Sequence, residues 1–125
     1  MDRLVSLVPG REGVGEYRVR GDEPFLRGHF PGAPIFPGVL LVESAAQLAG
    51  VVAQSTPQTA PLKNLRLTAL RNVRILGPAG PGDLILVRAS VTGRLGGLVQ
   101  AEAECRVGDR LILTAGLTLS GDLPI

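Results

Sequence analysis

Apolar and polar residues alternate along several segments of this chain, with the two-residue period of a half-exposed β-strand. Over residues 14–20, for example, Tyr17 and Val19 alternate with charged residues. The segments between such runs are rich in Gly, Pro and Asp, which favour turns. Strands are therefore predicted over residues 3–8, 14–20, 62–70 with a continuation to 75, 84–92, 98–107 and 111–119.

One segment, residues 38–54, consists almost entirely of Val, Leu, Ala and Gly. It predicts a helix, and its apolar surface on nearly all sides predicts that other structure encloses it. Glu43, Ser44 and Gln47 near its middle argue against a membrane span, because a charge in lipid is costly. Two strands, one long helix and then several strands predict a single α+β domain over residues 1–125, with a sheet folded around the helix.

The composition indicates a globular chain with one core: 45% of its 125 residues are hydrophobic, and the mean hydropathy is +0.28. The single cysteine, Cys105, cannot form an intramolecular disulfide, so a buried position in a cytoplasmic protein is expected. The first residues lack the basic and apolar regions of a signal peptide. A net charge of +2 without a run of Lys or Arg, and with no Trp, argues against nucleic-acid binding.

The candidate chemistry lies at the start of the apolar segment. The only histidine, His29, precedes residues 30–37, where three prolines exclude helix and interior strand. Glu43 is the only carboxylate of the apolar segment, and its sequence neighbours disfavour the charged form of its carboxyl group. Gln47 follows one helical turn later on the same face and can hydrogen-bond that group. An imidazole on a stiff loop and a carboxyl group in an apolar helix predict proton-transfer catalysis.

Each of these residues also has a structural interpretation. A lone histidine is often structural, Glu43 could form a buried salt bridge with an arginine, and Gln47 could satisfy a buried polar partner. Gly38 could serve a turn, or could offer its amide at the helix N-terminus, where the dipole favours negative charge. A metal site is not supported, because the chain has no second histidine and its cysteine is distant in sequence.

Residues 28–47 read Gly-His-Phe-Pro-Gly-x-Pro-x-x-Pro-Gly-Val-Leu-x-x-Glu-x-x-x-Gln, which resembles the signature of the 3-hydroxyacyl-[acyl carrier protein] dehydratases. A second match covers residues 70–75 and 81–83, and the resemblance extends from Asp2 to about Ser120. It implies a hotdog fold, in which a curved antiparallel sheet wraps around one long central helix. It also implies dehydration of 3-hydroxyacyl thioesters to trans-2-enoyl thioesters in fatty acid biosynthesis.

The resemblance also assigns roles to the candidate residues. His29 would take the proton from C2, and the amide of Gly38 would hold the thioester carbonyl. Glu43, positioned by Gln47, would protonate the departing hydroxyl. No cofactor or metal is implied, since the phosphopantetheine arm of acyl carrier protein presents the substrate. The family further implies a homodimer or a trimer of dimers, in which His29 comes from one chain and Glu43 from the other.

Acyl length and pathway stay open at this point and include polyketide and polyene lipid synthesis. Family members carry an aromatic N-terminal segment that this sequence lacks, and Phe36 stands where Met is usual. The alternative functions are a hotdog thioesterase and a non-catalytic acyl-binding subunit. Tunnel candidates are Phe30, Phe36, Ala46 and Gly50, and candidates for docking the acidic carrier are Arg27, Arg66, Arg71 and Arg74.

Overall fold

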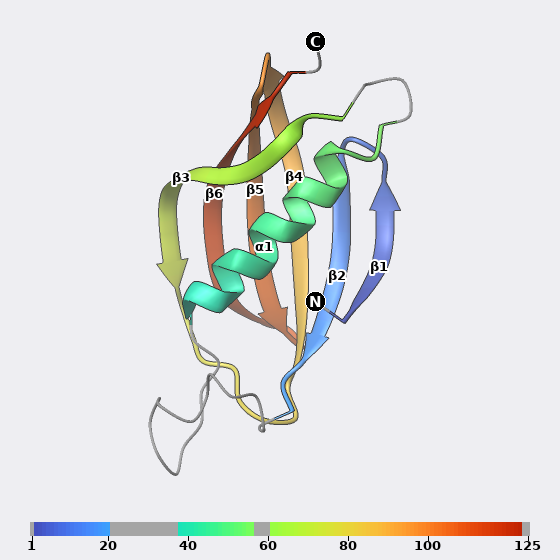
Figure 1. Ribbon diagram of the computed structural model, residues 1–125. Coiled ribbons are helices and arrows are strands. Elements are labelled where there is room, and N and C mark those ends of the chain that lie inside the picture. Colours follow the sequence, from blue (N-terminus) through green and yellow to red (C-terminus); the bar gives the residue numbers. More distant parts are fainter. Residues whose placement is uncertain (1, 21–37, 57–60, 124–125) are drawn as a thin grey trace.

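The structure is a computed structural model that describes residues 2–20, 38–56 and 61–123. Within these residues a six-stranded antiparallel sheet curves around one helix, which crosses its concave face (Figure 1). The sheet order is β1-β2-β4-β5-β6-β3, so β1 and β3 are the edge strands. The predicted α+β architecture is confirmed. Its elements are β1 (Arg3–Val8), β2 (Glu12–Arg18), α1 (Gly38–Ala53), β3 (Lys63–Ile75), β4 (Leu84–Leu95), β5 (Leu98–Val107) and β6 (Arg110–Asp122).

Turn geometry explains where the strands differ from the predicted limits. β1 and β5 match, whereas β2 begins earlier, at Glu12, because the hairpin before it turns at Gly10, whose φ is 73°. β4 was predicted to end before Gly93 but continues to Leu95. A register shift between Val91 and Gly93 accommodates this glycine as an irregularity inside the strand. An isolated glycine therefore marked a bulge here and not the end of a strand.

The core lies between α1 and the sheet. Alternate residues of β5 point into it, and Val99, Ala101, Ala103 and Cys105 are all buried. Burial raises the pKa of the Cys105 thiol to about 12, and the charge of Glu104 adds to this effect. The thiol is therefore inert, and its predicted buried position is confirmed. The buried face of α1 consists of Leu41, Val42, Ala45, Leu48, Ala49, Val52 and Ala53.

The opposite side of α1 is left uncovered by the described part of the chain. Val39 is 72% exposed and Val51 is 45% exposed. The described part of the chain therefore covers α1 on one side only, and the enclosure of its other side stays a prediction. The sheet curves around one side of α1 only, so an apolar stripe remains exposed on the other side. An exposed apolar stripe of this kind is typical of a surface that contacts another molecule or chain segment.

The C-terminal end of α1 is held by a side chain from β4. The last turn contains no basic residue of its own, but Arg94 Nη1 donates a hydrogen bond of 2.8 Å to the carbonyl of Ala53. The amide of Gly10 donates to the carbonyl of Val52 at 3.2 Å. Both bonds satisfy carbonyls that a helix end leaves without partners, and the positive charge of Arg94 suits the helix dipole.

We expect Arg94→Ala to lower the free energy of unfolding by about 1–2 kcal/mol, because the Ala53 carbonyl loses a charged donor. Denaturant unfolding measures this loss. Arg88→Ala is the matched control on the same strand, since the ion pair of Arg88 with Glu104 spans 4.0 Å at an exposed site. Its effect should stay within about 0.5 kcal/mol. Equal losses in both variants would contradict the role of Arg94.

Among residues 2–20, 38–56 and 61–123, no helix has the length and apolar character that crossing a membrane requires. The prediction that α1 is a core helix agrees with the burial of its sheet-facing side.

Candidate active site

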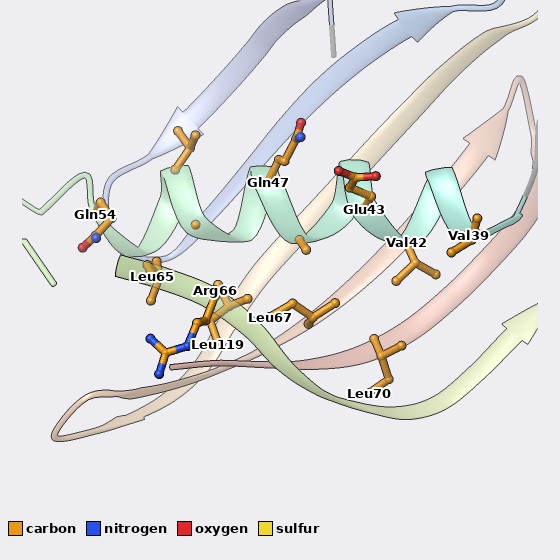
Figure 2. A pocket seen from close by; sticks show the side chains of 13 residues that line it. Val39, Val42, Glu43, Gln47, Gln54, Leu65, Arg66, Leu67, Leu70 and Leu119 are labelled. Carbon is orange, nitrogen blue, oxygen red and sulfur yellow. The ribbon is translucent and has the colours of Figure 1, made fainter. Parts of the chain in front are cut away.

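A groove of about 720 Å³ runs along the uncovered side of α1, between this helix and the edge strand β3 (Figure 2). Its helical wall is a stripe of residues that recur every three or four positions from Val39 to Gln54. Leu65, Leu67 and Leu70 of β3 form the facing wall. Most of the groove is therefore apolar, and its polar groups are few enough to have defined roles.

The shape of β3 makes this facing wall possible. Its pairing with β6 is interrupted by three register shifts, and Asn64 and Asn72 adopt φ values of 56° and 51°. Asn tolerates this left-handed conformation better than most residues, and such irregularities bend a strand. β3 consequently curves around the side of α1 (Figure 1). Leu67 and Leu70 remain 36% and 46% exposed on it.

Glu43 and Gln47 project from the same side of α1, one turn apart, and both line the groove (Figure 2). Their shared face was predicted from their spacing. Glu43 itself is exposed in the single chain, although the groove that it lines is mostly apolar. Its apolar sequence neighbours Leu41, Val42 and Ala45 lie on the buried face instead. None of the ion pairs among the described residues involves Glu43, so a buried salt bridge does not explain it either.

Gly38 is the first residue of α1, as predicted from its place after the prolines. A Cβ atom at this position would lie 2.5 Å from Cδ1 of Ile75, at the end of β3. The glycine therefore permits a close approach between the helix start and β3. Its amide is also one of the helix donors without an intrahelical partner, so both interpretations of Gly38 are compatible with the structure.

Ala46 and Gly50, two of the four tunnel candidates, line the groove. Phe30 and Phe36 lie outside the described residues, as do His29 and Arg27. The leucines of β3 and Gln54 also line the groove, although the sequence did not predict them there. The sequence signal for this wall of the groove was the apolar residues of β3. They can be recognised as a wall only once the strand order shows that β3 is an edge strand.

The three described docking candidates differ in their surroundings. Arg71 Nη1 lies 3.6 Å from Glu102 Oε1, so part of its charge is already paired. Arg66 lines the groove, and its Nη1 donates to the carbonyl of Asn64 at 2.9 Å. Arg74 is exposed, and no partner for it is found in the part of the chain that the structure describes. Arg74 therefore has the most accessible charge of these three described candidates.

The chain matches the family model of the FabA-like domain over residues 1–116. It is 35% identical over 117 residues to the 3-hydroxyacyl-[acyl-carrier-protein] dehydratase FabZ of Caldanaerobacter subterraneus subsp. tengcongensis, covering 94% of this chain and 82% of that protein. It is 37% identical over 117 residues to the FabZ of Chloroflexus aggregans, covering 94% of this chain and 81% of that protein.

Solved structures with the same fold include the dehydratase heterocomplex ApeI:P from Xenorhabdus doucetiae. It aligns with a TM-score of 0.78 at 18% identity, covering 95% of this chain and 80% of that one. A Streptococcus mutans UA159 protein bound to acetyl CoA aligns with a TM-score of 0.74 at 14% identity, covering 98% of this chain and 90% of that one. These likenesses concern the fold alone.

Proposed function

This chain belongs to the FabA-like family and has the predicted hotdog fold, and on that premise we propose that it dehydrates 3-hydroxyacyl thioesters on acyl carrier protein during fatty acid biosynthesis. The observation that carries the proposal is the position of Glu43, which lines an apolar groove beside the helix start at Gly38. The reaction takes place in the cytoplasm, where the lone cysteine stays reduced.

In the proposed reaction, His29 takes the proton from C2 of the substrate. Negative charge then develops on the thioester oxygen, where the amide of Gly38 and the helix N-terminus stabilise it. Glu43 gives a proton to the hydroxyl group on C3, the C3–O bond breaks, and water leaves as the C2=C3 double bond forms. No electrons are gained or lost overall, so the proposed step requires no redox cofactor.

The exposed position of Glu43 in a single chain makes a second copy part of the proposal. A carboxyl group acts as an acid more effectively in a dry site, and the uncovered sides of α1 and β3 are apolar at Val39, Val51, Leu70 and Ile75. A homodimer would cover these residues and could bring His29 of one chain to Glu43 of the other. Trimers of dimers are compatible with the same contact.

We expect Arg74→Ala to raise the KM for a carrier-bound substrate several-fold, while KM for a small thioester mimic does not change. The reason is that an exposed arginine would attract the acidic carrier, and salt should weaken that attraction. Steady-state kinetics at low and high ionic strength measure both effects. Arg88→Ala, on β4 and outside the groove, serves as the control. If both substrates respond equally to salt, Arg74 has no role in docking.

A further inference from the structure

The groove changes in chemical character along α1. Glu43 and Gln47 lie in its first part, and the stretch beyond them is formed mainly by Gly50, Val51, Leu65 and Leu67. Arg66 also lines this stretch, with its guanidinium bonded to the carbonyl of Asn64. This apolar stretch ends at Gln54, which lies beside Leu65 in Figure 2. An apolar stretch with a polar group at its end is suited to a hydrocarbon chain of limited length, because each methylene gains from leaving water while a polar end wall offers nothing to it.

Gln54 is fixed in position at that end. Its Nε2 donates to the carbonyl of Leu62 at 2.8 Å, and its Oε1 accepts from the amide of Leu62 at 3.1 Å. The nitrogen and the oxygen of the side-chain amide are thus both hydrogen-bonded to the main chain of Leu62. A side chain held by paired hydrogen bonds moves aside only by losing both, so Gln54 acts as a rigid wall.

The spacing along the helix gives the length of the apolar stretch. Glu43 and Gln54 are eleven residues apart, which corresponds to about 16 Å along the helix axis. In the other direction, from Glu43 to Val39, the groove extends only about 6 Å along the helix axis. An extended hydrocarbon chain advances about 1.25 Å per carbon, from a bond of about 1.5 Å at an angle of about 111°. The longer direction therefore holds about thirteen carbons beyond the carbon that faces Glu43.

We propose that the acyl tail of the substrate lies in this groove, from Glu43 towards Gln54, and that the Gln54–Leu62 hydrogen-bond pair sets the maximum acyl length. This inference rests on the proposed function and specifies its substrate class. The carbon at Glu43 is C3 in the proposed reaction, so the limit is about sixteen carbons. Because Glu43 is on α1 and Gln54 directly follows its last residue in the same chain, their separation does not depend on which chain supplies His29.

Gly50 offers a way to shorten the same groove. A Cβ atom at Gly50 would lie 3.6 Å from Cδ2 of Leu65, an ordinary contact distance, so Ala fits there. A leucine at this position would extend beyond that contact and cross the groove. Gly50 is about 10 Å along the axis from Glu43, which holds about eight carbons beyond C3, so Gly50→Leu should limit the substrate to about eleven carbons.

The test measures kcat/KM for enoyl thioesters of about six, twelve and eighteen carbons. Gly50→Leu should lower the ratio of medium-chain to short-chain activity by about tenfold or more, and Gly50→Ala should lower it less. Gln54→Ala should raise the ratio of long-chain to medium-chain activity, because it removes the end wall. Gly93→Leu is the matched control: it adds the same side chain where a Cβ would meet nothing within 4 Å, on a strand away from the groove.

Unchanged ratios in both Gly50→Leu and Gln54→Ala, in active enzymes, would overturn the inference and leave the proposed function intact. Dissociation of the oligomer by Gly50→Leu without a change in the ratio would also overturn it, since the groove would then be filled by the second copy. Absence of hydration by the unmodified protein at every length would overturn the proposed function itself, and this inference with it.

Discussion

Glu43→Gln is expected to lower the turnover number by about 10²–10⁴-fold, the usual contribution of general acid–base catalysis, while the protein still folds and associates as before. Glutamine keeps the shape and hydrogen-bonding capacity of the side chain but has no proton to transfer. Because Glu43 is exposed in the single chain and forms no ion pair among the described residues, its replacement should not disturb the fold. Turnover and thermal melting of the same preparation measure both quantities.

Glu12→Gln is the matched control, since it makes the same chemical change at an exposed position on β2, outside the groove. The control should retain its turnover number. His29→Ala should lose a factor similar to that of Glu43→Gln, and the double variant should lose little more, because both residues act in one proton-transfer unit. Normal turnover in Glu43→Gln would remove the proposed acid, and lowered melting with normal turnover would indicate a structural role.

Mixing two inactive variants should restore activity if each site is shared between chains. In a heterodimer of His29→Ala and Glu43→Gln chains, one site would carry both changes and the other would carry neither. Random association of equal amounts should therefore recover about one quarter of the unmodified activity, since about half of the dimers are mixed and each has one intact site. Activity after denaturation and joint refolding, or after coexpression, measures this recovery.

The control for this experiment is each variant refolded alone, which should remain inactive. No recovery in a mixture that demonstrably contains heterodimers would mean that His29 and Glu43 act within one chain. A stable monomer with full activity at micromolar concentration would remove the shared site altogether. Either outcome would leave the family assignment intact and would change the account of how Glu43 is shielded from water.

Most of the fold could be predicted because local signals and the global arrangement agree. The alternation in β5 predicted its limits and the burial of Cys105, and the prolines before Gly38 predicted where α1 begins. The continuation of β4 beyond Gly93 could not be read in this way, since a glycine in a bulge and a glycine in a turn look the same in sequence.

The site was less predictable because its walls come from segments far apart in the chain. The shared face of Glu43 and Gln47 followed from helical spacing alone. The exposure of Glu43 could not be predicted from the sequence. Adjacent residues of a helix point in different directions, so apolar sequence neighbours do not bury a side chain. The role of the β3 leucines depends on the sheet order, which places β3 at an edge beside α1.

Hydration of trans-2-enoyl thioesters by the purified protein is the most direct test of the proposed function, because the dehydration is reversible and the conjugated double bond absorbs light. We predict a loss of this absorbance with formation of the 3-hydroxyacyl thioester, no release of free thiol, and the same equilibrium mixture when the 3-hydroxyacyl thioester is supplied instead. Release of free thiol without hydration would identify a thioesterase, and no reaction with either substrate would identify a non-catalytic acyl-binding protein; both results would contradict the dehydratase proposal.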